Sequence, residues 1–218
     1  MISVEEALTK IKNTAKRLNS IEKTVPNALG YVLSEDIFSP ISMPPFDQSA
    51  MDGYAIHFIE GNEYQNIGEV KAGDASNFDL KPGEAVRIFT GAMIPKGSNT
   101  VVKQEIVSVI NEKITLEEKV SLGENIRPKG EQIKTDQLAL AEGTYLNPGA
   151  IGFIATLGYT HVKVYRKPTI TVIATGDELT KPGIPLESGK IYESNTFTLQ
   201  AALNYSRFSV TIKTVEDD

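Results

Sequence analysis

The residue pattern changes twice along the chain, and these changes constrain the fold more than any single residue does. Apolar residues follow helical spacing near the N-terminus, whereas short β-like runs separated by Gly, Pro and Asn fill residues 41 to about 136. Helical spacing returns after Asn147. This order predicts a β-rich module inserted into an α/β framework.

The N-terminal part of that framework is predicted to be helical. Ser3 and Glu6 have the spacing of a capping box, in which each side chain accepts a hydrogen bond from the other residue's backbone amide. The apolar residues that follow repeat at intervals of three and four, and they predict one amphipathic helix over residues 4–18. A shorter helix is expected over residues 27–33, where the same spacing recurs.

The framework resumes after the inserted module. Asn147 is a good N-cap, Pro148 suits the first helical position, and Gly158 is placed to end the helix. Alternating apolar residues then predict a half-buried strand over residues 161–165. Inside the module, residues 111–113 are expected to be the turn of a hairpin, and strands are predicted at 86–89, 101–102, 106–110 and 114–116.

The last part of the chain is predicted to form a βαβ unit. Residues 169–174 are a continuous apolar run, the type of strand that is buried on both faces of a parallel sheet. Asn195 is expected to cap a helix that reaches about Tyr205, and residues 208–215 supply the second strand. Three side chains of that helix are expected to face inward: Leu199, Ala202 and Leu203. Because two strands do not make a stable doubly wound sheet, a truncated domain is expected here.

These patterns together predict a multidomain fold of the α/β and β classes. The expected division has four parts: an N-terminal helix packed on the α/β part (1–19), a small α/β domain (20–38 and 137–166), an inserted β-rich domain (39–136) and the first βαβ of a truncated parallel-sheet domain (167–218).

Composition narrows the classes of function. The formal net charge of −6 argues against nucleic-acid binding, since such proteins normally present a basic face. The chain shows no apolar run long enough for a membrane span and no signal peptide, so a cytoplasmic protein is expected. Zero cysteines exclude thiol catalysis and thiolate metal sites, and two histidines argue against a histidine-ligated metal or a Ser-His-Asp triad. Carboxylates, hydroxyls, Lys, Arg, backbone amides or a hard metal such as Mg²⁺ remain for chemistry.

Residues 44–55, with the sequence PPFDQSAMDGYA, fit neither helical nor strand periodicity. Asp52-Gly53 is the pair best suited to a tight turn with positive φ, and Ser49 is small enough for a ligand to approach closely. Residues 41–70 hold five acidic residues and no Lys or Arg. Taken alone, the segment is more simply interpreted as a rigid hairpin turn.

The two aspartates of this segment are expected to have different roles. Asp47 follows two stiff prolines and a phenylalanine, and we expect it to accept backbone amide hydrogen bonds that shape the loop. Asp52 lies beside Gly53 with no evident structural partner, so its exposed carboxylate is expected to act on a ligand, by holding Mg²⁺ or steering a proton.

Four further segments share this glycine-rich character: 90–97 (TGAMIPKG), 123–131 (GENIRPKGE), 174–179 (ATGDEL) and 193–195 (ESN). Taken singly, each is more often a turn than a site. Asp177 and Glu178 follow the first strand of the βαβ unit, at the sheet edge where open α/β folds bind ligands. These carboxylates could hold Mg²⁺ together with substrate phosphates and water, and a structural role for the pair is equally open. The chain contains neither a dinucleotide-binding glycine pattern nor a P-loop.

Taken together, these segments resemble the motifs of the MoeA/gephyrin E-domain family, the molybdopterin molybdenumtransferases of molybdenum-cofactor synthesis, in order and spacing along the chain. The resemblance implies an enzyme that takes adenylyl-molybdopterin and molybdate, with Mg²⁺, and yields molybdenum cofactor and AMP. It implies that the last domain is molybdopterin-binding-like. It also implies a homodimer, with the site between the β insertion of one subunit and the molybdopterin-binding domain of the other, and molybdopterin adenylyltransferase as the upstream partner.

The resemblance also assigns roles to residues. Asp52, Thr90 and Glu178 match family positions tied to activity, and Asp177 matches a metal or ligand contact, so that Asp177 and Glu178 are the expected metal ligands. The expected substrate-binding residues are Ser49, Arg127, Lys129 and Asn195. Because molybdate and the pterin phosphates are anions, Mg²⁺ would have to invert the sign of an acidic wall, and Arg127, Lys129 and Lys96 could contact the anions directly.

Two departures from the family pattern affect these expectations. The family usually has Asp where this chain has Gln132, although Glu131 and Asp136 lie close by in the sequence. The family's later glycine-serine loop, lysine-bearing substrate segment and C-terminal β-barrel domain are absent from these residues, so the chain alone is not expected to turn over substrate. A non-catalytic dimerisation and binding scaffold of the same family is the alternative function.

Overall fold

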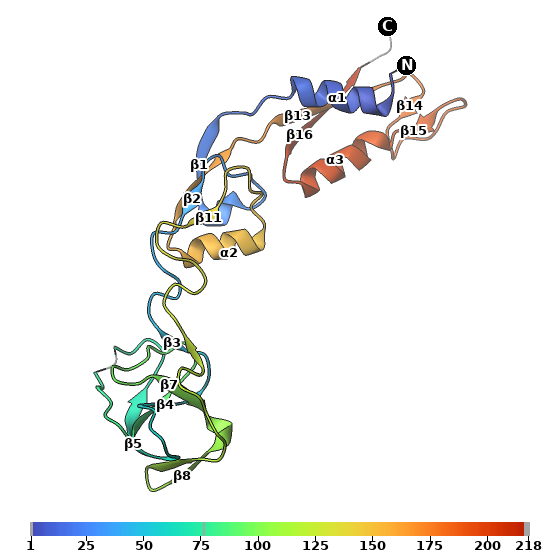
Figure 1. Cartoon of the computed structure of the whole chain (residues 1–218). Helices are drawn as coiled ribbons and strands as arrows, with labels where there is room; N and C mark the ends of the chain where they lie inside the picture. The colour runs from blue at the N-terminus through green and yellow to red at the C-terminus, as the bar shows by residue number, and fades with distance from the viewer. Residues whose placement is uncertain (1, 76, 216–218) are drawn as a thin grey trace. The chain divides into compact units, whose positions relative to one another are not determined.

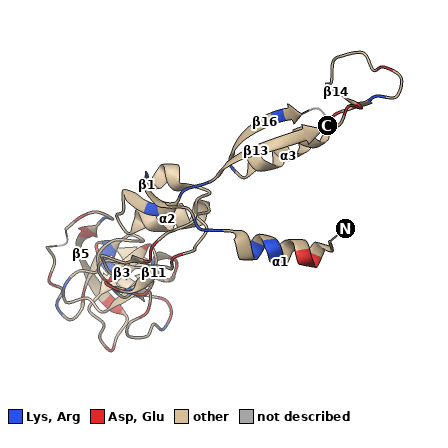
Figure 2. Cartoon of the chain, turned by 90° about the horizontal axis from the view of Figure 1, so that it is seen from above, with Lys and Arg blue, Asp and Glu red and all other residues tan. Residues whose placement is uncertain are grey.

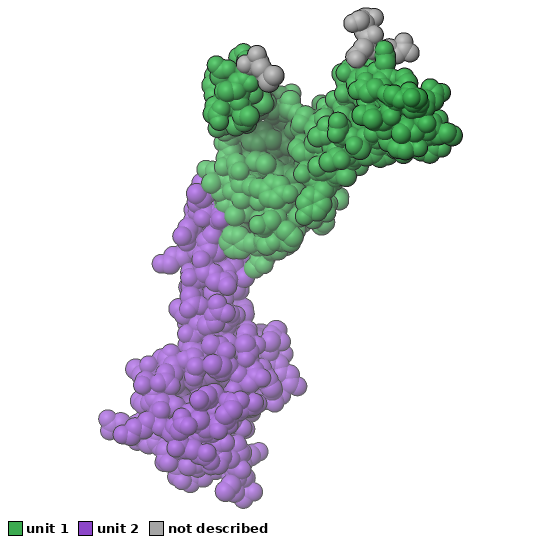
Figure 3. Space-filling view, turned by 90° about the vertical axis from the view of Figure 1, so that its right-hand side faces the viewer, with its two compact units in different colours: residues 1–37, 140–218 green, residues 38–139 purple. Residues whose placement is uncertain are grey.

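The structure, a computed structural model, describes residues 2–75 and 77–215 and divides the chain into two compact units (Figure 1). Residues 1–37 and 140–218 form unit 1, and residues 38–139 form unit 2 (Figure 3). The inserted unit is thus continuous in sequence, whereas the framework is made of two segments. The finer division into four domains stays a prediction.

Unit 2 is built on a six-stranded sheet with the strand order β7-β4-β6-β5-β9-β8. Strands β5 and β6 pair in parallel, and the other neighbours pair antiparallel. The strands are β4 (Gly53–Ile56), β5 (Glu63–Val70), β6 (Glu84–Ile88), β7 (Thr100–Lys103), β8 (Val107–Ile110) and β9 (Lys113–Leu116). A short 3₁₀ helix, η2 (Gln104–Ile106), joins β7 to β8.

Both faces of this sheet carry buried residues. Ala55 and Ile56 are consecutive in β4, and neither has any exposed surface. Since consecutive strand residues point to opposite faces, they belong to two different core clusters. Val101 and Val102 of β7 are divided between the clusters in the same way. Each face of the sheet therefore carries its own apolar core.

The β8–β9 hairpin is closed by a turn of two residues. Asn111 and Glu112 both have positive φ, 50° and 66°, which is the conformation that favours the twist of a tight hairpin. The predicted three-residue turn was one residue too long, because Lys113 already pairs with Ile110. Two short pairs complete the strands near unit 2: β3 (Gln48–Ser49) with β10 (Ile126–Arg127), and β2 (Ile37–Phe38) with β11 (Leu138–Leu140).

The predicted capping box is confirmed at the start of α1 (Val4–Thr14), where the Ser3 Oγ accepts from the Glu6 amide at 3.1 Å. Acidic residues occupy the first turn of α1 and Lys12 the last, the order that suits the helix dipole (Figure 2). The predicted end at residue 18 was wrong. The helix ends at Thr14, followed by the extended C-cap residue Ala15, and Arg17 beyond it pairs with Glu142 at 2.6 Å.

The small α/β part of unit 1 contains β1 (Ser20–Thr24), which pairs antiparallel with β12 (His161–Tyr165). The helix predicted over residues 27–33 was wrong. Only a 3₁₀ helix, η1 (Val25–Ala28), forms, because Gly30 turns the chain at φ 81° and Leu33 is used in a bridge to Val164. Helix α2 (Pro148–Thr156) begins as predicted, with the Asn147 Oδ1 accepting from the Ala150 amide at 2.8 Å.

The end of unit 1 is the predicted βαβ. Strands β13 (Thr169–Thr175) and β16 (Ser209–Val215) pair in parallel, with α3 (Asn195–Tyr205) as the crossover (Figure 1). Two short strands, β14 (Leu179–Thr180) and β15 (Ile191–Tyr192), form a second parallel pair.

Burial in this βαβ differs from prediction. Ala174 is the one buried residue among those of β13, so the strand is not covered on both faces. Helix α3 turns neither Leu199 nor Ala202 inward, and Leu199 is 50% exposed. Leu203 is half-buried. The sheet of β13 and β16 has two strands, so it is too narrow to cover α3. Within the described part of the chain, no helix has the length and apolarity needed to cross a membrane.

Candidate functional site

Three of the motif segments meet in unit 2. We call them the Asp52 loop (44–55), the Thr90 loop (90–97) and the Arg127 loop (123–131). The Asp52 loop lies in the middle. Its Ser49 exchanges backbone hydrogen bonds with the Thr90 loop on one side, at 2.9 Å from Gly91 and 3.0 Å to Ala92. Strand β3 pairs on the other side with β10 of the Arg127 loop. Three segments that are far apart in sequence therefore form one surface.

Asp52 has a structural partner, contrary to expectation. One of its carboxylate oxygens, Oδ1, accepts hydrogen bonds from both the backbone amide and the hydroxyl of Thr90, each at 2.8 Å. The Thr90 amide, then its hydroxyl, and more weakly the charge of Arg87 lower the pKa of Asp52 below its ordinary value. Asp52 is nevertheless exposed. The site thus presents a carboxylate that stays ionised at neutral pH, which suits a cation ligand better than a proton donor.

Asp47 takes the structural role that was predicted for it. Its Oδ1 accepts a hydrogen bond from the backbone amide of Lys129 at 2.7 Å, and its carbonyl accepts from the amide of Ile94 at 2.9 Å. Asp47 therefore ties the Asp52 loop to both of its neighbours.

Gly53 and Ser49 differ from expectation. Gly53 is the first residue of β4 and does not have positive φ. Glycine is needed there because an added Cβ would lie 1.8 Å from the carbonyl oxygen of Val102 in β7. Ser49 is 1% exposed, and its hydroxyl donates to the carbonyl of Met51 at 2.6 Å. The hydroxyl therefore shapes the loop and is covered from any ligand in this conformation.

Two of the three side chains predicted to bind anions already form ion pairs with acidic residues. Arg127 pairs with Glu131 at 2.9 Å, and Lys96 pairs with Asp79 at 3.3 Å. Lys129 is exposed, and within the described residues no ion pair is found for its side chain. Lys129 is therefore the freest of the three to meet an anion.

Arg87 was missed by the sequence analysis. It lies in β6 between the buried Val86 and Ile88, and its guanidinium approaches the Asp52 loop, donating to the carbonyl of Gly53 at 3.4 Å. A charged residue inside an apolar strand, three positions before Thr90, is the signal that could have found it.

The remaining motif segments lie in unit 1. The Glu178 carboxylate folds over Gly176, where an added Cβ would lie 2.6 Å from its Oε2, and the carbonyl of Asp177 accepts from the Lys190 ammonium. The predicted cap at Asn195 was wrong, because Asn195 is the exposed first residue of α3.

The carboxylate of Glu193 takes over the capping of α3. It accepts from both the hydroxyl and the amide of Thr196, and these bonds, the hydroxyl first, lower the pKa of Glu193. A cavity of about 310 Å³ lies beside this turn, with Ala174, Leu179, Lys181, Glu193, Thr196 and Phe197 among its lining residues.

The carboxylates of Asp177 and Glu178 are adjacent in sequence at the end of β13. No group of three or more His, Asp or Glu side chains suited to a metal occurs within residues 2–75 and 77–215. Mg²⁺ commonly takes one or two carboxylates and completes its shell with water and substrate phosphate, so this pair fits such a shared site but not an all-protein cage.

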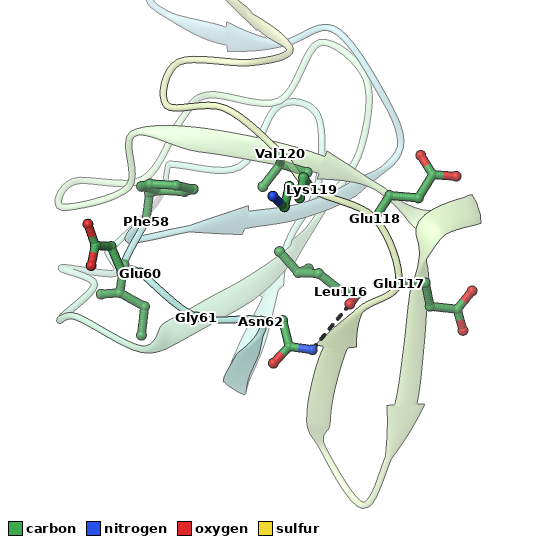
Figure 4. Close-up of a pocket in the computed structure, with 10 residues that line it drawn as sticks. Phe58, Glu60, Gly61, Asn62, Leu116, Glu117, Glu118, Lys119 and Val120 are labelled. Carbon is green, nitrogen blue, oxygen red and sulfur yellow. Dashed lines mark hydrogen bonds between the residues drawn. The ribbon is translucent and has the colours of Figure 1, made fainter.

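Unit 2 also has a hollow of about 510 Å³ outside the three loops, lined by residues 58–62 and 116–120 (Figure 4). Glu60, Glu117 and Glu118 line it together with the apolar Phe58 and Val120. None of the motif segments lines this hollow, so it is not the candidate site.

Comparison with known proteins places the motifs in a family context. The family model described as "MoeA N-terminal region (domain I and II)" matches residues 2–158. Over 226 residues, the chain is 38% identical to molybdopterin molybdenumtransferase of Staphylococcus aureus strain Mu50, covering 100% of this chain and 54% of that protein. The Haemophilus influenzae protein of the same name is 37% identical over 209 residues, 93% of this chain and 52% of its own length. The chain thus spans about half the length of these curated relatives.

A solved structure gives the same result for the fold. The molybdopterin biosynthesis moeA protein from Pyrococcus horikoshii OT3 superposes with a TM-score of 0.85 at 32% identity, over 100% of this chain and 61% of that one. On the strength of the family match and of these relatives, the chain belongs to the MoeA N-terminal region family.

Proposed function

We propose that this chain serves molybdenum-cofactor biosynthesis as part of a molybdopterin molybdenumtransferase, which inserts molybdate into adenylyl-molybdopterin and releases AMP. The similarity to curated relatives over the whole chain supports the pathway. At the level of residues, the proposal rests on the Asp52–Thr90 pair. One carboxylate oxygen of Asp52 accepts hydrogen bonds from both the amide and the hydroxyl of Thr90, on an exposed surface made of three motif loops.

The proposed roles follow from charge. Asp52 supplies a fixed negative charge that Thr90 orients, and Asp177 and Glu178 would hold Mg²⁺ at the end of β13. Mg²⁺, when bound, would neutralise phosphate and molybdate oxygens and act as a Lewis acid. Lys129 would contact an anionic oxygen directly, as would Arg127 after exchanging its Glu131 partner.

Asn195 is the exposed first residue of α3 and follows the Glu193 carboxylate that caps the helix. We propose it as a substrate contact beside Glu178. The upstream partner would be the molybdopterin adenylyltransferase that makes the adenylylated substrate, and the working protein would be a cytoplasmic homodimer in which Asp52 acts on ligand held by the neighbouring subunit.

The test compares Asp52→Asn with Asp47→Asn in the intact protein. Asparagine keeps an oxygen that can accept from Thr90, so Asp52→Asn should fold normally but lose turnover by roughly 10²-fold. Asp47→Asn should show the reverse balance, with a lower melting temperature and most of its turnover, because a neutral amide oxygen accepts more weakly than a carboxylate from the Lys129 amide, the side-chain bond that joins Asp47 to the Arg127 loop. The measurements are molybdenum-cofactor formation from purified adenylyl-molybdopterin and molybdate, and thermal melts. Full activity in Asp52→Asn would overturn the proposed role.

A non-catalytic dimerisation scaffold is the second candidate, and one observation favours it. The apolar stripe of α1 is exposed, with Val4 70%, Leu8 51% and Ile11 60% accessible. An apolar stripe of this kind is a common site of self-association. Light scattering across a range of concentrations tests it, since a monomer at every concentration would exclude the scaffold. Because the proposed enzyme is a homodimer too, turnover decides between the two: a dimer that keeps its turnover in Asp47→Asn and loses it in Asp52→Asn would favour the enzyme.

A further inference from the structure

Arg87 is held in place by aromatic rings on the surface of unit 2. It lies in β6 directly opposite Tyr54 of β4. Its guanidinium carbon is 5.1 Å from the centre of the Tyr54 ring and 5.2 Å from that of Phe89. Both distances are within the range of cation–π contact, and the two rings limit the directions in which the guanidinium can point.

The donors of Arg87 point to the backbone that carries Asp52. Its Nη1 donates to the carbonyl of Gly53 at 3.4 Å, and its Nη2 donates to the Oε1 of Gln104. The backbone amide of Gln104 in turn donates to the carbonyl of Asp52 at 3.0 Å. The two peptides on either side of Gly53, Asp52–Gly53 and Gly53–Tyr54, are thus held by one connected group.

We propose that Arg87 is a positioning residue for Asp52, which fixes the loop so that the carboxylate meets Thr90 with one oxygen and faces outward with the other. The proposal rests on the proposed function only in taking Asp52 to be the group that acts on the ligand. Arg87 itself acts through Asp52, and the planar guanidinium suits this role because it donates in two fixed directions at once.

Charge supports the same assignment. The positive charge of Arg87 is among the causes that hold the pKa of Asp52 below its ordinary value, after the two bonds from Thr90. Removing that charge should therefore ease protonation of Asp52. The charge acts through space whether or not Arg87 positions the loop, so Arg87→Lys, which keeps the charge but loses the two-pronged donation, is the variant that separates the two roles.

The experiment follows the backbone amide of Thr90 by ¹H–¹⁵N NMR between about pH 7 and pH 3. That amide donates to the carboxylate of Asp52, so its chemical shift reports the titration. The variants are Arg87→Gln, which removes charge and geometry, and Arg87→Lys, which keeps the charge but loses the two-pronged donation. The matched control is Lys113→Gln, since Lys113 is a cation in β9 of the same sheet and pairs with Glu63 at 2.8 Å.

The midpoint pH should be lowest in the unaltered protein and in Lys113→Gln, higher in Arg87→Lys and highest in Arg87→Gln. Turnover of the intact protein should fall roughly tenfold in Arg87→Gln, the scale of losing a group that orients a ligand-binding carboxylate. An unaltered midpoint pH of the Thr90 amide in Arg87→Gln would overturn the proposal. If Arg87→Gln does not fold, an unaltered midpoint in Arg87→Lys would overturn it instead. If Asp52→Asn keeps full activity while the midpoints still move in this order, the proposed function fails and the positioning by Arg87 stands.

Discussion

Replacing Gly53 by alanine should destabilise unit 2 through a clash that the sheet cannot relieve locally. The new Cβ would lie 1.8 Å from the carbonyl oxygen of Val102, 2.8 Å from its carbonyl carbon and 3.0 Å from the Cα of Lys103. All three are backbone atoms, so no side chain can rotate away. Strands β4 and β7 would have to separate by more than an ångström to reach ordinary contact.

The magnitude follows from what that separation disrupts. Overpacking in a rigid environment costs up to about 3 kcal/mol, and each ladder hydrogen bond lost between β4 and β7 adds about 1 kcal/mol. We therefore expect a loss of about 4 kcal/mol in the free energy of unfolding. For a unit of this size that corresponds to a melting temperature lower by about 15 °C or more.

Urea unfolding followed by circular dichroism measures this loss, with Gly61→Ala as the matched control. Gly61 also lies in unit 2, and the nearest atom to its added Cβ is the Cδ1 of Ile59 at 3.9 Å, so its variant should stay within about 0.5 kcal/mol of the unaltered protein. If Gly53→Ala unfolds at the same urea concentration as Gly61→Ala, the close approach of β4 and β7 is not what requires glycine.

Three further predictions concern stability. Gly152→Ala should raise the free energy of unfolding by about 0.5–1 kcal/mol in thermal melts, because Gly152 lies inside α2 with no atom near its added Cβ. Glu112→Gly should add up to about 1 kcal/mol in urea unfolding, because it relieves a left-handed residue at φ 66° in the β8–β9 turn. Thr90→Val should make the free energy of unfolding depend less on pH in the acid range, measured by urea unfolding at a series of pH values. The pKa of Asp52 is lowered on folding, so its stabilisation is present above the unfolded pKa and is lost as the pH falls through the folded one.

The correct sequence predictions rest on local signals. The capping box at Ser3, the N-cap at Asn147 and the β8–β9 hairpin each depend on residues a few positions apart. Their hydrogen bonds join residues of the same short segment, so the spacing of residue types was enough to find them.

The wrong predictions involve distant partners. Asp52 was expected to be free because Thr90, which supplies both of its donors, lies 38 positions away. Leu33 was expected in a helix, but Val164 takes it into a bridge. Gly53 was assigned to a turn, although a carbonyl of another strand explains it better. In each case a tertiary contact outweighed local propensity.

The pairing of β2 with β11 has a consequence for how the inserted unit folds. Near this pair, the Ser39 amide donates to the carbonyl of Gln137 at 2.9 Å, and the Asp136 amide donates to the carbonyl of Ser39 at 2.8 Å. These bonds hold the two ends of the insertion side by side, so the insertion replaces what could be a short loop of the framework. The entropy of closing that loop is borne by the insertion's own hydrogen bonds and core. An excised segment of residues 38–139 should therefore fold by itself, and the same segment could be transplanted into a loop of an unrelated host without straining it.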